Sequence, residues 1–381
     1  MTKITMSSIQ GRLCVILSAG IVGLIFGFTL PLFAIIMEND SIDIALIGLS
    51  AATESLAIIF VGPFIPKLFS FLGVRKSMFY CIGTGTIVIV LIAFSDPLYA
   101  WFPLRFILGA CVYILLIASD LWISQETSSH VRGRVIAIYG ISVTSGMAAG
   151  PLLLPTVGSD GYIPILVSAA ILATASIPLL FVSGNIVVNI PEKPIKMRPF
   201  LRTIPLLLIA VFAFGIIESS ALTMVPIYGL HLGLNETNAL ILLTLFITGS
   251  IILQLPLGWI SDRLDRYYIL KICTIVGLCS SIALLFLFKY DWALWLCLFL
   301  IGGTIAGTYT LSLAIIGDLY NGVKLATAIS LFAMIFAIGS TLGPISSGYI
   351  IRLWDPHGLI LVLVIAFGLI WGASNLKKMV N

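Results

Sequence analysis

The sequence predicts an all-α membrane protein with twelve transmembrane helices, arranged as two pseudo-symmetric six-helix bundles. Hydrophobic residues make up 60% of the 381-residue chain and charged residues 9%, whereas an average soluble domain is about 25% charged. Apolar stretches recur along the chain, each close to the about 20 residues that cross a bilayer core. Because a chain in lipid must satisfy its own backbone hydrogen bonds, these stretches should be helices.

The first half carries six expected spans, at residues 13–37, 45–65, 77–95, 98–122, 135–157 and 163–183. The second half carries six more, at residues 203–228, 238–260, 270–288, 293–317, 325–351 and 358–376. The first span is longer than the apolar core of a signal peptide, so we expect it to remain in the membrane. Its glycines and its proline suit close helix packing and local kinks.

The basic residues alternate between the two sides of this arrangement. With both termini in the cytoplasm, seventeen of the 20 Lys and Arg residues fall in cytoplasmic segments. The outer loops hold only Lys289 and Arg352, and Arg105 lies within a span. The positive-inside rule therefore predicts a multi-pass protein of the cell inner membrane with both termini cytoplasmic.

One long polar connection, rich in proline and basic residues, divides the chain. We expect a first bundle over residues 1–183, a cytoplasmic linker over 184–202 and a second bundle over 203–381. The halves repeat weakly: Gly150-Pro151 recurs as Gly343-Pro344, and each pair has a glycine four residues earlier, Gly146 and Gly339. Parallel repeats with a substrate path between them are one plan of membrane transporters.

Charged and glycine motifs lie where the expected spans turn. Gly258, Asp262, Arg263 and Arg266 reproduce most of a G-x-x-x-D-R-x-G-R pattern, and the matching first-half turn keeps Gly73, Arg75 and Lys76. Arg105 and Gly109 fit R-x-x-x-G on the fourth span, Arg132-Gly133-Arg134 precedes the fifth span, and Gly146-x-x-x-Gly150-Pro151 lies within it. Together these motifs resemble those of the major facilitator superfamily of secondary transporters, most closely the bacterial drug:proton antiporters and their YcaD-like branch.

The resemblance implies that the two halves rock between inward-open and outward-open states. It assigns gating roles to the charged turn residues and the glycine–proline pairs: Asp262, Arg263, Arg266, Arg132, Arg134, Gly146, Gly150, Pro151, Gly343 and Pro344. The alternative is that the charges only set the topology and that the glycines only permit close helix packing.

Three ionisable residues lie well inside expected spans: Glu54, Arg105 and Glu218. A charge at the bilayer centre costs at least about 2.5–3.5 kcal/mol, so such a residue is a functional candidate. We interpret Glu54 and Glu218 as proton-coupling residues and Arg105 as the counter-ion of Glu54. The alternatives are a static Glu54–Arg105 pair and a Glu218 that is held neutral or hydrogen-bonded beside two serines.

Candidate substrate-binding residues are four aromatic residues on the spans and one amide, namely Phe26, Phe212, Phe214, Tyr309 and Gln254. The alternative for each aromatic residue is contact with lipid or helix packing. The three histidines are scattered, and no metal-ligand spacing, catalytic triad or phosphate-binding loop is apparent. The sequence therefore predicts neither an enzyme nor a metal or other cofactor. The six cysteines lie in apolar runs and read as small buried hydrophobes.

We accordingly predict a proton-coupled secondary transporter that exports a small amphipathic compound. Its partners would be that substrate, protons and the lipid bilayer, with no nucleic acid, and it would function as a monomer. Alternative hypotheses are an uptake symporter or facilitator for a small nutrient, a lipid flippase, and a membrane scaffold or sensor without transport activity.

Overall fold

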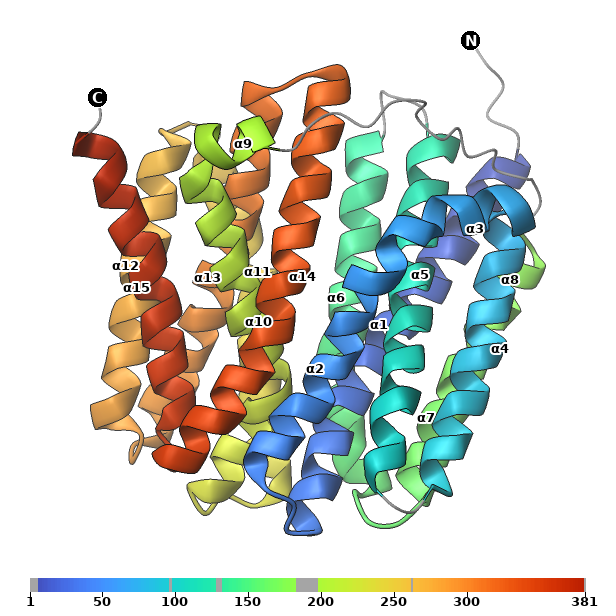
Figure 1. The fold of residues 1–381 in the computed structure, drawn as a ribbon, viewed down its shortest axis with the longest axis horizontal. Helices are drawn as coiled ribbons and strands as arrows, with labels where there is room; N and C mark the ends of the chain where they lie inside the picture. Colours follow the sequence, from blue (N-terminus) through green and yellow to red (C-terminus); the bar gives the residue numbers. More distant parts are fainter. Residues whose placement is uncertain (1–5, 96–97, 128–131, 183–197, 262, 380–381) are drawn as a thin grey trace. The chain divides into compact units, whose positions relative to one another are not determined.

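The computed structural model describes residues 6–95, 98–127, 132–182, 198–261 and 263–379, and these residues form helices joined by short turns (Figure 1). No β-strand occurs among them. Twelve helical stretches in the described ranges are long and apolar enough to cross a membrane. The predicted all-α membrane architecture with twelve spans is confirmed.

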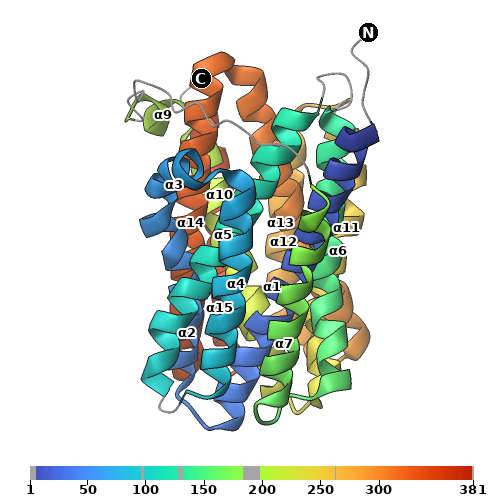
Figure 2. The same ribbon diagram turned by 90° about the vertical axis from the view of Figure 1, so that its right-hand side faces the viewer.

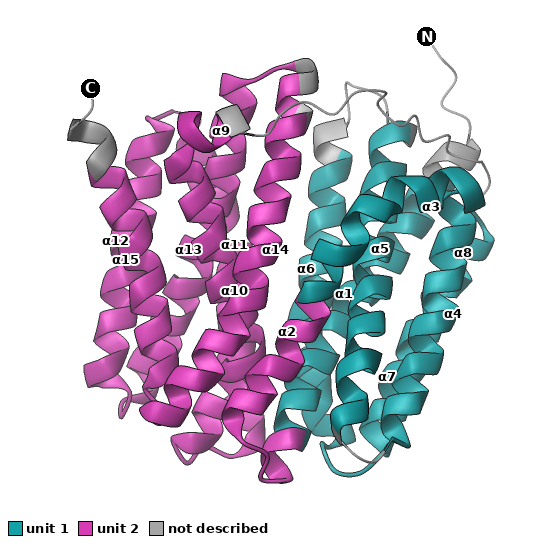
Figure 3. Ribbon diagram, viewed as in Figure 1, with its two compact units in different colours: residues 1–36, 56–192 teal, residues 37–55, 193–381 magenta. Residues whose placement is uncertain are grey.

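The chain divides into two compact units (Figure 3). Unit 1 comprises residues 1–36 and 56–192, and unit 2 comprises residues 37–55 and 193–381. The chain passes between the units three times: once near the end of α1, once within α2, and once between residues 192 and 193, outside the described residues. The boundaries drawn from sequence at residues 183 and 203 stay a prediction, and most of the linker between them lies outside the described residues.

The helices of unit 1 follow the expected spans to within a few residues. They are α1 (Met6–Asn39), α2 (Ile44–Val61), α3 (Ile65–Leu72), α4 (Val74–Ala93), α5 (Trp101–Glu126), α6 (Arg132–Val157), α7 (Ile163–Thr174) and α8 (Ser176–Leu180). The last residues of α1 and the first part of α2 belong to unit 2. Within unit 1, α4 packs against both α5 and α7 (Figure 2).

The turn after the second span contains more helix than the sequence suggested. A single 3-10 turn at Gly62–Phe64 continues α2 into α3, whose apolar face buries Ile65 and Phe69. Gly73 ends α3 with φ +80°, a conformation that favours glycine. The Gly73 of the predicted turn motif is therefore required by backbone geometry.

Unit 2 contains the remaining helices. They are α9 (Arg198–Thr203), α10 (Pro205–His231), α11 (Glu236–Ser261), α12 (Arg266–Leu287), α13 (Asp291–Leu319), α14 (Gly322–Leu353) and α15 (Gly358–Met379). Helix α10 is the central one: most of its residues are buried, and it packs against α11, α13, α14 and α15. A side chain of α10 that is not buried within unit 2 is thus an exception.

Candidate functional site

Of the three intramembrane charges, Arg105 and Glu54 are the most buried. Arg105 lies on α5 with 0% of its surface exposed, and its guanidinium carbon is 5.0 Å from the centre of the Phe33 ring on α1. This cation–π contact gives the charge a favourable partner where lipid gives none. Glu54 lies on α2 with 3% exposed. The pairing of Glu54 with Arg105 stays a prediction.

Glu54 is located where α2 meets α14. The neighbouring residue Ser55 forms a hydrogen bond between its hydroxyl and that of Ser340, at 3.0 Å. Nearer the start of α2, Gly48 lies directly against the backbone of Pro344 and Gly348, so that a Cβ at Gly48 would collide with it. Backbone contact of this kind is how small residues join membrane helices. The stretch of α2 that carries the acid is therefore packed closely against α14.

Glu218 lies midway along α10 and is half-buried, unlike most of that helix. No hydrogen bond or ion pair joins its carboxyl to another residue in the described part of the chain. The adjacent serines point elsewhere: Ser219 donates to the Gly215 carbonyl at 2.7 Å, and Ser220 accepts from Ser347 of α14 at 2.8 Å. The expected alternative, a Glu218 bound to these serines, is not what the side chains show.

Within each unit, glycines pack one helix closely against another, and the two helix pairs are equivalent in the repeat. In unit 1, Gly146 and Gly150 of α6 lie against the backbone of α1 at Gly20 and Gly27. In unit 2, Gly339 and Gly343 of α14 lie against α10: a Cβ on Gly339 would meet the Phe212 carbonyl, and one on Gly343 would meet the Ile216 carbonyl. The repeated glycine–proline motif thus marks the same helix contact in each half. Whether it also gates stays a prediction.

Aromatic rings cluster between α10, α13 and α14. The ring centres of Phe214 and Tyr309 are 4.6 Å apart, and Phe214 also packs against Phe336 at 5.6 Å. Phe332 extends the cluster from Tyr309 at 5.4 Å. Phe214 and Glu218 are four residues apart on α10 and so share one face of that helix. The structure therefore brings together two of the sequence-predicted aromatic residues and the acid.

The other predicted substrate-binding residues have different surroundings. Phe26 on α1 packs edge-on against Tyr113 of α5, with ring centres 6.2 Å apart. Gln254 on α11 is exposed and donates a hydrogen bond to the Thr310 hydroxyl at 2.8 Å. Phe212 is half-buried two residues before Phe214, on another face of α10. Their role in binding stays a prediction.

The predicted gating charges are partly outside the described residues. Asp262 lies outside them, and so do the side chains of Arg132 and Arg134, although α6 begins at Arg132. Arg263 stacks on the Trp259 ring at 3.8 Å. Arg266 forms an ion pair with Asp318 of α13 and also donates to the Ala314 carbonyl at 3.3 Å. Asp318, near the end of α13, thus has a basic partner.

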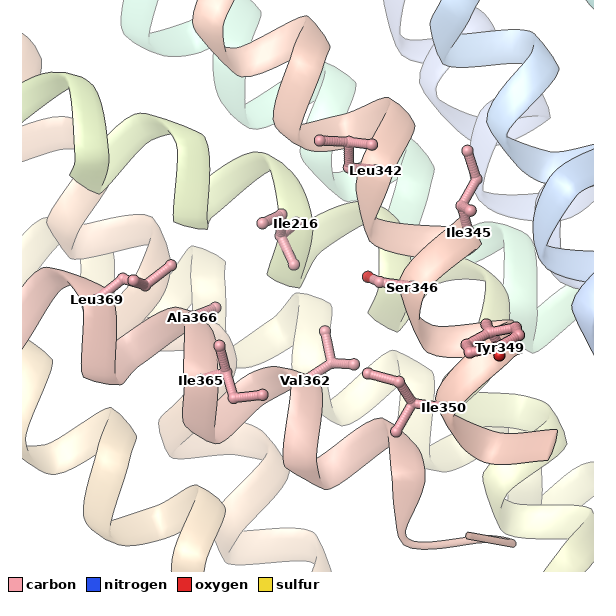
Figure 4. A pocket seen from close by; sticks show the side chains of 10 residues that line it. All are labelled: Ile216, Leu342, Ile345, Ser346, Tyr349, Ile350, Val362, Ile365, Ala366 and Leu369. Carbon is pink, nitrogen blue, oxygen red and sulfur yellow. The ribbon is translucent and has the colours of Figure 1, made fainter. Parts of the chain in front are cut away.

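A cavity of about 400 Å³ lies between α10, α14 and α15 (Figure 4). Its wall is apolar apart from the hydroxyl groups of Ser346 and Tyr349 on α14. Ile216 of α10 closes one side, and Ile365 and Leu369 of α15 line another. These two α15 residues are also among the exposed apolar residues, so the cavity opens sideways on the surface of unit 2.

Sequence reasoning missed several of these partners. Phe332 and Phe336 lie on the same side of α14 at an i, i+4 spacing, which could have suggested a shared face. His231, one of the three scattered histidines, is the last residue of α10 and bonds two carboxylates far away in sequence, Glu38 and Asp355. No local pattern predicts such a contact. His130 lies outside the described residues.

Relatives and solved structures match over nearly the whole chain. The sequence pattern described as Major Facilitator Superfamily matches residues 15–290 and 207–376. The MFS-type transporter YfkF of Bacillus subtilis is 28% identical, covering 95% of this chain and 94% of its own length. An MFS-type transporter of Yersinia enterocolitica is 26% identical over 81% of this chain and 80% of its own.

Two solved structures share the fold. A variant of the nucleoside transporter NupG superposes with a TM-score of 0.80 at 14% identity, covering 97% of this chain and 99% of that one. A bacterial homolog of the human lysosomal transporter Spinster, solved in an inward-facing state, gives 0.78 at 12% identity, covering 97% and 98%. Members of the matched family are membrane transporters and not enzymes. This chain belongs to the major facilitator superfamily and is a membrane transporter.

Proposed function

We propose that this transporter works by alternating access and couples the efflux of a small amphipathic compound to the entry of protons. The observation that carries the proposal is the placement of Glu218. It is an acid inside a membrane helix, on the same helical face as a ring of the Phe214–Tyr309–Phe336 cluster, and it has no ion-pair partner among the described residues.

The chemistry of this arrangement favours exchange. A carboxyl without a counter-ion in a membrane span is stabilised by a proton or by a bound cation. The aromatic rings supply apolar surface and, for a cation, the negative faces of the rings. A substrate with an apolar body and a positive or polar end would therefore compete with the proton for Glu218, and that competition is the basis of antiport.

Glu54 and Arg105 also support the proposed proton coupling. Both are buried in spans, and Arg105 is the only basic residue expected in one. A second acid that binds a proton, with a charge partner that stabilises its ionised form, would let protonation follow the state of the transporter. The scarcity of basic residues in the spans disfavours multiply charged anions as substrates.

The remaining parts of the proposal concern placement. The distribution of Lys and Arg supports an inner-membrane protein with both termini cytoplasmic. The ends of unit 2 that carry Arg263 and Arg266 would then face the cytoplasm, where these residues, with Asp262, Arg132 and Arg134, would contribute to a gate. The motif set supports the drug:proton antiporter branch, and we expect a functional monomer.

Proton release tests the proposal directly. Purified protein in lightly buffered detergent is mixed with a panel of small amphipathic cations, and the change in pH is recorded. We expect release in the wild type and none in Glu218→Gln or Glu54→Gln. Asp160→Asn, which removes an exposed carboxyl from a turn of unit 1, is the matched control and should release protons normally. Binding without proton release in the wild type would contradict the coupling and favour uptake by facilitated diffusion.

One observation favours a second candidate, a lipid transporter. The cavity between α10, α14 and α15 opens sideways and is apolar, with Tyr349 and Ser346 as its hydroxyl groups (Figure 4). Lipid movement would make Ser346→Leu more damaging than Glu218→Gln. A fluorescent-lipid translocation assay in proteoliposomes distinguishes the two functions, because the proposed antiporter should show no lipid movement above that of empty vesicles.

A further inference from the structure

A histidine bridges two distant carboxylates at one end of unit 2. His231 ends α10, its Nε2 lies 2.7 Å from a carboxylate oxygen of Glu38 at the end of α1, and its Nδ1 bonds Asp355 in the turn between α14 and α15. In sequence, Asp355 lies 124 positions from His231 and Glu38 lies 193 positions from it. The His231 side chain is 21% exposed and that of Glu38 24%. The Asp355 side chain is 56% exposed, so the bridge is half-buried on its Glu38 side and reaches solvent at Asp355.

A second ion pair joins the same two segments. Arg352, at the end of α14, places its Nε 3.3 Å from a carboxylate oxygen of Asp43 in the α1–α2 turn. We call these five residues the distal clasp: Glu38, Asp43, His231, Arg352 and Asp355. All belong to unit 2, and they lie at the end that carries its α10–α11 and α14–α15 turns (Figure 3).

Other charged groups also lie at this end, and one of them, Asp40, is exposed in the α1–α2 turn. His357 follows Asp355 in the same turn and packs against the rings of Phe288 and Trp354. Burial disfavours the charged form of its ring and lowers the pKa of His357. Glu236 starts α11, and Lys289 and Asp291 flank the start of α13. Among the described residues, the His231 ring therefore contacts two acids and no basic group.

Only the protonated form of His231 satisfies this geometry. A neutral imidazole carries one N–H, whereas the imidazolium donates from both nitrogens. With a carboxylate at each nitrogen, removal of the proton leaves one carboxylate facing a lone pair. Histidine ordinarily changes charge between about pH 5 and pH 8, and a carboxylate at each ring nitrogen favours the charged form and moves this change to higher pH. The bridge can therefore be broken by a change in protonation alone.

The distal clasp lies at the end of a contact between α2 and α14, which we call the seam. Residues 37–55, which the chain contributes from its first half, pack on unit 2. Gly48 meets Gly348 and Pro344 of α14, and Ser55 bonds Ser340 further along the same seam. Loss of the His231 proton would weaken the hold at the tip and leave the Arg352–Asp43 ion pair, the glycine packing and the Ser55–Ser340 hydroxyl bond among the contacts of this seam.

We propose that the distal clasp is a proton-sensitive latch: with His231 protonated it holds residues 37–55 on α14 and keeps this end of the transporter closed, and loss of the proton lets the seam open. The effect of this opening on transport rests on the proposed alternating access. The latch itself can be measured without substrate or proton flux.

Cysteine labelling of the seam tests the latch. The six native cysteines are replaced by alanine, and Ser55→Cys serves as the reporter because its side chain is buried against α14. A small water-soluble thiol reagent is applied to the full-length protein in proteoliposomes at about pH 7 and about pH 9.5, which bracket the higher range expected for a histidine between two carboxylates. Each rate is divided by that of the denatured protein at the same pH, which removes the effect of thiol ionisation. Ser168→Cys, buried in α7 of unit 1, reports general loosening.

We expect normalised labelling at Ser55→Cys to be about tenfold faster at the higher pH, which corresponds to about 1.4 kcal/mol. His231→Gln should label fast at both values, and His231→Lys, which is mostly charged at both because lysine ordinarily loses its proton near about pH 10.4, should label slowly at both. His357→Gln is the matched control and should keep the wild-type ratio. If His231→Gln does not yield folded protein, Glu38→Gln makes the same prediction.

An unchanged pH ratio in His231→Gln, or an equal loss in His357→Gln, overturns the latch. So does a matching rise at Ser168→Cys, because the seam would then not be the part that opens. The result is separable from the proposed function. Proton release through Glu218 can fail while the latch stands, and the latch can fail while Glu218→Gln still abolishes proton release.

Discussion

Replacement of Gly343 by alanine tests the contact between α10 and α14 at its closest point. A Cβ at this position would lie 2.5 Å from the Ile216 carbonyl oxygen and 2.9 Å from the Ser220 hydroxyl, and closer still to the Ser219 hydroxyl, whereas ordinary contact begins at 3.4 Å. A carbonyl of the helix backbone cannot swing aside, so the helices must separate. Overpacking of this kind costs about 1–3 kcal/mol.

The matched control is Gly368→Ala on α15, where an added Cβ meets nothing within 4 Å. There the better helix propensity of alanine, about 1 kcal/mol, should leave stability unchanged or raised. The assay is the thermal unfolding midpoint of each purified variant in detergent. We expect the unfolding midpoint of Gly343→Ala to lie below that of the wild type. The midpoint of Gly368→Ala should be unchanged or higher. Equal midpoints in the two variants would refute the close contact on which this account of α10 and α14 depends.

Three further predictions concern the turns and the aromatic cluster. Asp262→Asn should shift the population towards inward-open states, measured as greater labelling of single cysteines at the cytoplasmic end; unchanged labelling contradicts it. A double-mutant cycle of Arg266→Gln and Asp318→Asn should give a coupling of about 0–1 kcal/mol in unfolding, as for exposed ion pairs. Tyr309→Phe should keep the substrate affinity, and Tyr309→Ala should weaken it, because the contact between the Tyr309 and Phe214 rings is worth about 0.5–1.5 kcal/mol. Equal affinities of the two variants would exclude the aromatic cluster as the binding surface.

The twelve spans could be predicted from sequence because length and apolarity are local properties. The rule that a bilayer core needs about 20 apolar residues fixes both the number of spans and their approximate ends. The glycine–proline repeat likewise marked α6 and α14 before their neighbours were known. What it did not reveal was that α1 and α10 are those neighbours, since a glycine says that a backbone comes close but not which one.

Long-range polar contacts escaped prediction for a physical reason. Arg266 finds Asp318, and His231 finds Glu38 and Asp355, through helix packing that brings distant turns together. Charge identity carries no information about such partners. The second helix is a similar case: its first part groups with unit 2 although its sequence belongs to the first half. A division of the chain by its polar linker could not show this.

The central claim, coupling through Glu218, is tested most directly by comparing two transport modes in proteoliposomes. Accumulation of a labelled amphipathic cation is driven by a pH gradient, and exchange of labelled for unlabelled substrate is followed without one. The account predicts that Glu218→Gln loses gradient-driven accumulation and retains exchange, because the permanently neutral side chain still lets the states interconvert with substrate bound. Gradient-driven accumulation at the wild-type rate in Glu218→Gln would contradict the claim.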